Sequence, residues 1–329
     1  MPRELLYREA INEALAFEMN RDNNVFIMGQ GIADRGGSYK VTKGLKKKFG
    51  AARVIDTPIA EASTTGMAIG AAIQGKRPII ELTYIDFTLL SMDMIVNQAA
   101  KYNFITGGTH SLPIVIRTQG GAGFGYGMHH SQSLEALFYH IPGLKIAIPS
   151  TPYDAKGLLG TAVRDEHPVL FIEHKLLYNT RGEVPKGEYT IPFGTAEIRH
   201  RGSDCTVVSY SLMANKCVEA AESLSDEGIS CEVIDLRTLV PMDRDTILQS
   251  VKKTGRLVIV NEAVKRGSVA SDISAWITEN AFQYLKAPVL RISGKITPVP
   301  YNRNLEKEVV PDIKKIITGI KSVVRDKIT

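Results

Sequence analysis

The sequence predicts an α/β protein whose helices and strands alternate and whose sheets are mainly parallel. Short apolar segments alternate with helical segments from one end of the chain to the other, which is the pattern of repeated β-α-β units. The chain has 329 residues, more than one hydrophobic core usually serves. We therefore expect two α/β domains.

The first half shows this alternation most clearly. The stripe of Ile11, Ala14, Leu15 and Met19 indicates an amphipathic helix. Gly75 is a natural helix stop after the apolar run that begins at Glu61. Helices are expected at residues 7–20, 41–49, 61–73, 91–104, 131–140 and 153–164, and strands at residues 25–28, 53–56, 78–84, 113–117, 145–148 and 169–173.

Residues 178–202 differ in character, because they are rich in glycine, proline and charge. We place a linker at residues 186–202, between a domain at 1–185 and a domain at 203–329. In the second domain, strands are expected at 206–209, 231–235, 257–261 and 289–292, and helices at 215–225, within 245–253, at 269–284 and from 310.

Charge and cysteine content exclude several classes of protein. The formal net charge is +5 and is spread along the chain, so no basic stripe for nucleic acid is evident. Three cysteines without metal-ligand spacing favour a reducing compartment. The sequence contains no run of about 18 apolar residues, so no membrane span is predicted. We expect a cytoplasmic protein, with a removed organellar transit peptide as the alternative.

Two glycine clusters do not fit a dinucleotide-binding loop. Gly29-Gln30-Gly31 lacks the third glycine of GxGxxG, and the third glycine is misplaced in the cluster that begins at Gly121. Neither a phosphate-binding GxxxxGK[ST] sequence nor an HExxH sequence is present.

Glu61 is the only charged residue between Pro58 and Gln74. A buried carboxylate needs a partner, and such a group could protonate or hydrogen-bond a ring nitrogen. The alternative is an exposed glutamate in the first turn of a helix, favoured by the helix dipole.

His129 and His130 end a loop that contains Gly120, Gly121, Gly123, Gly125 and Gly127. Glycines let backbone approach a ligand closely, and the loop could place an imidazole at the start of the next helix. A mobile surface loop with two solvated histidines is an equal alternative.

Several segments together resemble one family. They are VTKGL (41–45), DTPIAE (56–61), NQAAK (97–101), HSQS (130–133), IPGLK (141–145), PSTPYDAKGLL (149–159), DLRT (235–238) and TPVPY (297–301). This set, which covers nearly the whole chain, is similar to the beta subunit of the thiamine-diphosphate-dependent decarboxylating component of 2-oxo acid dehydrogenase complexes. EHKLLY (173–178) and Glu262-Ala263 most resemble the acetoin and pyruvate dehydrogenase subunits.

The resemblance implies a pyrimidine-binding domain followed by a transketolase-type C-terminal domain. It also implies an alpha subunit, in a tetramer of two alpha and two beta chains, that holds diphosphate and magnesium through a GDG…N motif. This chain has no GDG. A lipoyl acyltransferase is the implied further partner, and an acyl group from a 2-oxo acid or acetoin would pass to its lipoyl arm.

The resemblance also assigns residues. Glu61 matches the glutamate that hydrogen-bonds the aminopyrimidine ring, Phe87 an aromatic beside that ring, and Thr83 a neighbouring wall position. His130 matches the histidine that faces substrate and the lipoyl group. A site for a monovalent cation, potassium, is implied mainly from backbone carbonyls, with a plain helix end as the alternative; its positions are Ile114, Ala162, Val163, Asp165 and His167.

Two departures from the family pattern leave other functions open. Gln30 stands where a glutamate of an acidic path between paired cofactors is usual, and residues 62–65 (ASTT) replace larger or glycine-containing sequences. One rival is a split transketolase acting on sugar phosphates, although no basic and histidine cluster for phosphate is evident. The other is a non-catalytic scaffold subunit, against which Glu61, Phe87 and His130 argue.

Overall fold

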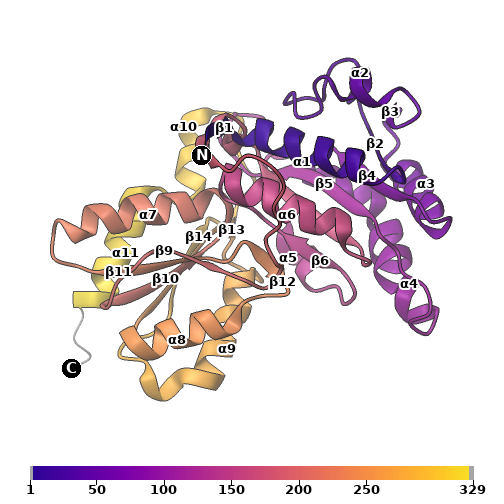
Figure 1. The fold of residues 1–329 in the computed structure, drawn as a ribbon. Helices are drawn as coiled ribbons and strands as arrows, with labels where there is room; N and C mark the ends of the chain where they lie inside the picture. Colours follow the sequence, from indigo (N-terminus) through magenta and orange to yellow (C-terminus); the bar gives the residue numbers. More distant parts are fainter. Residues whose placement is uncertain (1–2, 326–329) are drawn as a thin grey trace. The chain divides into compact units, whose positions relative to one another are not determined.

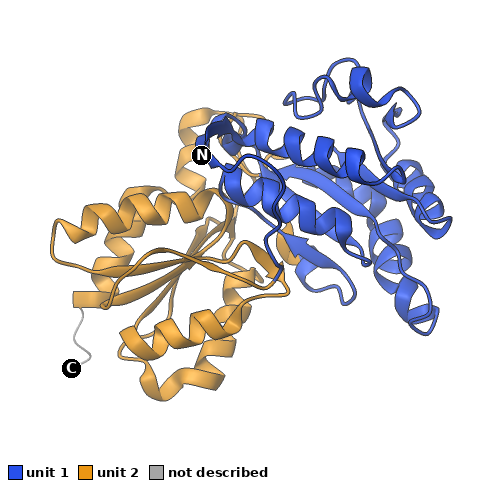
Figure 2. Cartoon of the chain, viewed as in Figure 1, with its two compact units in different colours: residues 1–120, 137–193 blue, residues 121–136, 194–329 orange. Residues whose placement is uncertain are grey.

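The computed structural model describes residues 3–325 (Figure 1). The chain divides into two compact units, which Figure 2 shows in different colours. Unit 1 comprises Met1–Gly120 and Leu137–Phe193, and unit 2 comprises Gly121–Ala136 and Gly194–Thr329. The glycine-rich loop therefore belongs to unit 2, although the strand before it belongs to unit 1.

The sheet of unit 1 is parallel, with strands in the order β6-β7-β5-β4-β2-β3. Its central strands are buried along their whole length, as expected where helices cover a parallel sheet. The strands are β2 Val25–Gly29, β3 Val54–Asp56, β4 Arg77–Leu82, β5 Val115–Gly120, β6 Lys145–Ala147 and β7 Val169–His174. A separate antiparallel pair joins β1 (Arg3–Leu6) to β8 (Arg181–Val184).

Helices α1 and α6 of unit 1 lie side by side (Figure 1). Helix α6 begins at Pro152, a residue suited to the first helical position, and the Thr151 hydroxyl accepts a hydrogen bond from the Asp154 N–H. Helix α3 packs on β4 together with η1 and η2. The bounds are α1 Tyr7–Arg21, α2 Leu45–Phe49, α3 Glu61–Ile73, η1 Ile85–Ser91, η2 Asp93–Ala99, α4 Ala100–Ile105, α6 Pro152–Arg164 and η3 Lys175–Asn179. Helix α5 (Glu135–Tyr139) crosses from one unit's residues to the other's.

Unit 2 is built on a sheet in the order β14-β13-β10-β11-β9, parallel except for β9. Helices α7 and α11 pack together on one face, and α8 and α9 on the other (Figure 1). The strands are β9 Glu197–His200, β10 Cys205–Ser209, β11 Cys231–Asp235, β12 Thr238–Val240, β13 Leu257–Val264 and β14 Leu290–Gly294. The helices are α7 Ser211–Ser225, α8 Arg244–Thr254, α9 Val269–Ala281, η4 Phe282–Tyr284, α10 Arg303–Val309 and α11 Ile313–Arg325.

The cysteines belong to the core of unit 2. Cys205, Cys217 and Cys231 are free thiols buried among apolar side chains of the sheet and of α7 and α11. Burial raises the pKa of the Cys217 and Cys231 thiols to about 12, so these groups serve as small apolar residues. Within residues 3–325, no helix has both the length and the apolar character that crossing a membrane requires.

The structure corrects several predicted elements. The helix expected at 41–49 begins only after Gly44, whose left-handed φ of 82° ends any earlier helical path. The helix expected at 91–104 is divided among η1, η2 and α4, and the one expected at 131–140 is limited to α5. Strands β8 and β9 lie in residues 178–202, where only short β-like pieces were expected, whereas helix α10 and strands β1 and β12 were not predicted. Short strands that pair with distant segments leave little local signal.

Candidate functional site

The carboxyl end of the unit 1 sheet carries the first group of predicted residues. Strand β2 lies between β3 and β4, so the chain changes direction across the sheet at β2 and β4. In open α/β sheets, ligands bind at the carboxyl ends of the strands at such a switch point. Gln30 follows β2, Thr83 follows β4, and Glu61 begins the helix after β3. The fold therefore brings these positions to the edge where a ligand is expected.

Glu61 is buried and hydrogen-bonded. Only 5% of the residue is exposed, which excludes the alternative of an exposed glutamate. The Gln30 side-chain amide donates a hydrogen bond to Glu61 Oε1, with Nε2 and Oε1 separated by 3.2 Å. The carboxylate also stands at the amino-terminal end of α3. Gln30, which stands where the family usually has a glutamate, is thus in direct contact with the predicted catalytic carboxylate.

Two neighbouring side chains have properties that suit a ring-binding wall. The Thr83 hydroxyl oxygen is buried and has no hydrogen-bond partner within residues 3–325. Buried hydroxyls are seldom left unpaired, so this atom is available to a bound polar group. Phe87 is half-buried in η1, the segment that follows Thr83. A carboxylate, an unpaired hydroxyl and an aromatic ring therefore occur in the segments around the β2–β4 edge.

The unusual residues 62–65 connect α3 to η1. Thr64 and Thr65 are buried, whereas Ala62 and Ser63 are exposed. The Thr65 hydroxyl donates to the Glu61 carbonyl and lies 3.0 Å from the Ser91 hydroxyl oxygen. This departure therefore affects the packing of η1, which carries Phe87.

The glycine-rich loop is anchored in unit 2. Its backbone amides donate hydrogen bonds to the carboxylates of Glu262 and Glu306, so three backbone contacts tie the loop to this unit. His129 is exposed, whereas His130 is half-buried and its backbone N–H donates to the Gly127 carbonyl. The two histidines thus occupy different environments.

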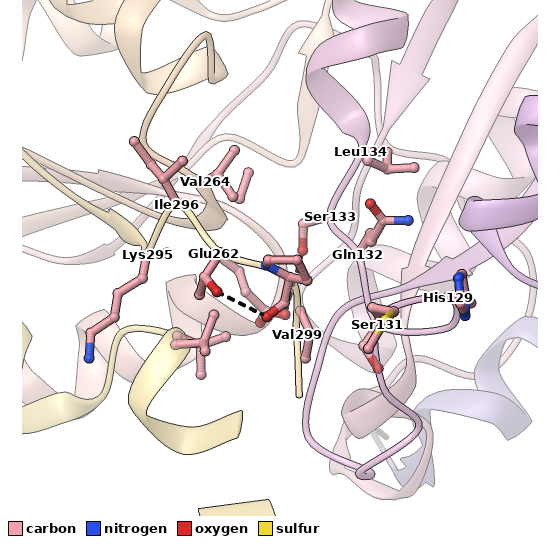
Figure 3. Close-up of a pocket in the computed structure, with 17 residues that line it drawn as sticks. His129, Ser131, Gln132, Ser133, Leu134, Glu262, Val264, Lys295, Ile296 and Val299 are labelled. Atoms are coloured by element: carbon pink, nitrogen blue, oxygen red, sulfur yellow. Dashed lines mark hydrogen bonds between the residues drawn. The ribbon is translucent and has the colours of Figure 1, made fainter. Parts of the chain in front are cut away.

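Unit 2 also contains a cavity of about 540 Å³. His129, rather than His130, belongs to its lining (Figure 3). Glu262 and Ser133 face each other there and form a long hydrogen bond of 3.5 Å. Sequence reasoning assigned no site role to Glu262 or Lys295, another lining residue. A carboxylate within the mainly apolar strand β13, directly after Asn261, was the available signal for Glu262.

The five predicted cation positions lie at the end of α6 and the turn after it, and just before β5. The Val163 and Asp165 carbonyls both accept hydrogen bonds from one nitrogen of Arg77, at 3.1 and 3.2 Å. The Ile114 carbonyl accepts from the Val169 N–H. These oxygens already have protein donors, but each carbonyl has a second lone pair for a cation.

The remaining cation positions show a local network. The Ala162 carbonyl accepts from the Asp165 N–H. The Asp165 carboxylate accepts from the His167 N–H at 2.9 Å and from Lys145 at 2.6 Å. Within the described residues, no cluster of three or more His, Cys, Asp or Glu side chains forms a metal site, so a cation here would depend on carbonyl oxygens.

Comparisons with known proteins find two domains, and the first match includes residues 121–136, which belong to unit 2 of the structure. Residues 3–181 match the transketolase pyrimidine-binding domain, and residues 194–316 match the transketolase C-terminal domain. A split-gene transketolase described as an inactive beta4 tetramer has the same fold, with a TM-score of 0.79 over 98% of this chain and 99% of that chain. Its sequence is 21% identical, so this likeness concerns the fold alone.

Three curated relatives match nearly end to end. The acetoin:2,6-dichlorophenolindophenol oxidoreductase subunit beta of Cupriavidus necator is 48% identical, with 99% of each chain covered. The pyruvate dehydrogenase E1 component subunit beta of Gracilaria tenuistipitata is 48% identical, covering 98% of this chain and 99% of the relative. The 2-oxoisovalerate dehydrogenase subunit beta of Bacillus subtilis is 43% identical, covering 96% and 98%. The chain therefore belongs to the family of pyruvate, acetoin and 2-oxoisovalerate dehydrogenase beta subunits.

Proposed function

We propose that this chain supplies the pyrimidine side of a thiamine-diphosphate site that is completed by an alpha subunit. The observation that carries the proposal is Glu61, a buried carboxylate at the start of α3 that accepts a hydrogen bond from the neutral amide of Gln30. Such a group can hold or accept a proton at a ring nitrogen. The missing GDG sequence supports the assignment of diphosphate and magnesium binding to the alpha subunit.

Four residues of this chain have a defined role in the proposal. When bound, thiamine diphosphate supplies a ring carbon that becomes nucleophilic on losing its proton. Glu61 would hydrogen-bond the aminopyrimidine ring and hold or accept a proton there. The unpaired Thr83 hydroxyl and the Phe87 ring would orient the pyrimidine. His130 faces the substrate and the lipoyl group, where an imidazole can deliver a proton or stabilise charge.

The substrate class follows from family membership. We infer that the assembly decarboxylates a 2-oxo acid or cleaves acetoin and transfers the acyl group to the lipoyl arm of an acyltransferase. The acetoin and pyruvate relatives are equally similar, at 48% identity. A split transketolase shares only the fold at 21% identity. Free buried thiols support a reducing compartment, and we place the protein in the cytoplasm.

Co-expression with an alpha subunit tests the proposal. The purified beta chain should show no turnover and weak thiamine diphosphate binding, because the diphosphate and magnesium ligands are absent. The co-expressed protein should form a tetramer of two alpha and two beta chains that acylates a lipoyl domain. Turnover by the beta chain alone would contradict the division of labour. An assembled tetramer that binds neither the cofactor nor substrate would indicate a scaffold.

The two histidines provide a second test. His130→Ala should reduce lipoyl-domain acylation by about 100-fold or more while leaving thiamine diphosphate affinity nearly unchanged. His129→Ala should be much milder, and it is the matched control because the residues are adjacent. If His129→Ala proves to be the inactive variant, the role belongs to the histidine that lines the unit 2 cavity.

We also propose that the carbonyls of Ile114, Ala162, Val163, Asp165 and His167 bind potassium. Thermal unfolding should occur at a higher temperature in potassium chloride than in choline chloride of equal ionic strength, because a ligand that binds only the folded chain stabilises it. Equal melting temperatures in the two salts would mean that these residues form a plain helix end without a cation. Its Val163 and Asp165 carbonyls would then accept hydrogen bonds from Arg77 alone.

A further inference from the structure

The glycine-rich loop is held by carboxylates at its backbone rather than by its side chains. The Gly123 N–H donates to Glu306 Oε1 at 2.7 Å, and the Gly125 N–H donates to Glu306 Oε2 at 2.9 Å. The Ala122 N–H donates to Glu262 Oε1 at 2.6 Å. Hydrogen bonds with an ionised acceptor are short and strong. Three amides within four residues of the loop are therefore fixed by two carboxylates of unit 2.

Glycine is required at this contact for space as well as for conformation. Gly125 and Gly127 have φ values of 70° and 72°. A Cβ atom at Gly127 would lie 2.4 Å from the Tyr301 ring, and one at Gly125 would lie 3.0 Å from the Tyr301 carbonyl oxygen. The loop is thus seated directly on the segment that leads into α10, the helix that carries Glu306.

Glu306 is itself buried, with 2% of the residue exposed. Each carboxylate oxygen accepts one loop amide, so the negative charge is compensated by two N–H dipoles. A buried charge is costly unless it is hydrogen-bonded. The loop and the carboxylate therefore stabilise each other, and loss of either leaves the other poorly satisfied.

The conformational cost of ordering this loop explains why such an anchor is needed. Glycine loses more backbone freedom on ordering than any other residue. The loop contains Gly121, Gly123, Gly125 and Gly127 before the two histidines. Without hydrogen bonds to its backbone, a segment of this composition would sample many conformations.

We propose that Glu306 is a positioning residue that fixes the glycine-rich loop in the shape that presents His129 and His130, with Glu262 as a second anchor. The anchoring is a property of this chain alone. Its consequence for catalysis rests on the proposed function, because it requires that His130 acts on the substrate or the lipoyl group.

Hydrogen exchange of the full-length chain tests the anchoring. In the wild type, the amides of Ala122, Gly123 and Gly125 should exchange at least about 10-fold more slowly than unprotected amides. Glu306→Gln should accelerate exchange of Gly123 and Gly125 by about 10- to 100-fold, because one acceptor oxygen becomes an NH₂ donor. Exchange in β10 should not change. Glu308→Gln is the control, because this glutamate lies on the same helix but its side chain is 66% exposed.

Two outcomes of the hydrogen-exchange experiment would overturn the proposal. Loop amides that exchange freely in the wild type would overturn the proposal, whatever the variant does. Wild-type exchange of the loop in Glu306→Gln would overturn it as well. If amides throughout Glu306→Gln exchange faster than in the wild type, the protection of the loop amides in the wild type decides whether the loop is anchored.

Kinetics of the alpha–beta assembly test the positioning role. Glu306→Gln should lower kcat for lipoyl-domain acylation by about 10-fold or more without changing thiamine diphosphate affinity, since the histidines are displaced but the unit 1 residues are intact. Unchanged kcat despite a released loop would overturn the role. If even the wild type acylates no lipoyl domain, the proposed function fails, whereas the anchoring seen by hydrogen exchange remains.

Discussion

Unit 1 contains two kinds of buried carboxylate, and they differ in how their charge is balanced. Glu61 accepts a hydrogen bond from the neutral amide of Gln30. Glu81 and Glu173, by contrast, share the guanidinium of Arg117. All three glutamates are at least 95% buried, so burial alone does not distinguish a candidate catalytic group from a structural one.

The structural carboxylates both pair with one guanidinium. Arg117 donates two hydrogen bonds to Glu173, at 2.7 and 2.8 Å, and one to Glu81 at 2.8 Å. The Tyr178 hydroxyl donates to Glu173 as well. Burial by itself lowers the pKa of a guanidinium, but the negative charges of Glu173 and Glu81 raise the pKa of Arg117 above its ordinary value. Arg117 therefore stays charged, whereas burial raises the pKa of the Glu173 carboxyl above its ordinary value despite the pairing with Arg117.

The comparison shows what a reactive carboxylate requires. A bidentate ion pair leaves a carboxylate little freedom to exchange partners or protons. A single amide donor at 3.2 Å orients Glu61 without neutralising it. Structural ion-pair networks also shift pKa values and can therefore resemble active sites. The type of hydrogen-bond partner is thus a better guide than burial to whether a carboxylate is catalytic.

The largest expected effect comes from breaking the ion cluster. Arg117→Met should lower the free energy of unfolding by about 3–5 kcal/mol, because two buried carboxylates lose their cation. Urea denaturation measures the change. Lys46→Met is the control, since Lys46 pairs with Asp34 on the surface and should change stability by about 1 kcal/mol or less. An equally stable Arg117→Met protein would show that the cluster is not structural.

Glu61→Gln should lower activity strongly and change stability little, in contrast to Arg117→Met. Activity of the alpha–beta assembly should fall by about two to four orders of magnitude, because the amide keeps a hydrogen bond but cannot transfer a proton. The free energy of unfolding should change by about 1 kcal/mol or less. Proton–deuterium exchange at the thiazolium carbon should slow in parallel, with the exposed Glu222→Gln as control. Exchange at the wild-type rate would remove Glu61 from the mechanism.

Gln30→Glu should convert the neutral pairing into one between like charges. Two carboxylates this close cannot both ionise readily, so one carboxyl keeps its proton to a higher pH. The acid limb of the activity–pH profile should move upward by about one pH unit, and the ratio of fast to slow cofactor activation should change. Gln283→Glu, at an exposed glutamine of unit 2, should have neither effect. Identical profiles would mean that residue 30 is merely structural.

Tyr178 provides the smallest effect, on the structural side of the comparison. Burial, followed by the negative charge of Glu173, raises the pKa of Tyr178 well above 10. Above pH 10 the unfolded chain loses this proton while the folded chain keeps it, so stability falls as pH rises. Tyr178→Phe should reduce that fall by up to about 1.4 kcal/mol per pH unit. A slope identical to that of the exposed control, Tyr284→Phe, would contradict this assignment.

The alternation of helices and strands followed from the sequence alone. Strand β2 and helices α3 and α6 lie close to their predicted residues, because each has a strong periodic pattern or a clear start or stop signal. The presence of a carboxylate in the apolar run 58–74 was also visible. These features depend on short stretches of sequence, where side-chain period and glycine or proline position carry the information.

Tertiary structure decided the partners. That Gln30, after β2, donates to Glu61, at the start of α3, joins residues separated by 31 positions. The anchoring of Gly123 by Glu306 joins residues separated by 183 positions. No local pattern reports such contacts, because they arise from strand order and from which segments pack together. The sequence by itself therefore determined the element types and the candidate residues, whereas only the fold decided which carboxylate meets a cation, which meets an amide and which holds a loop.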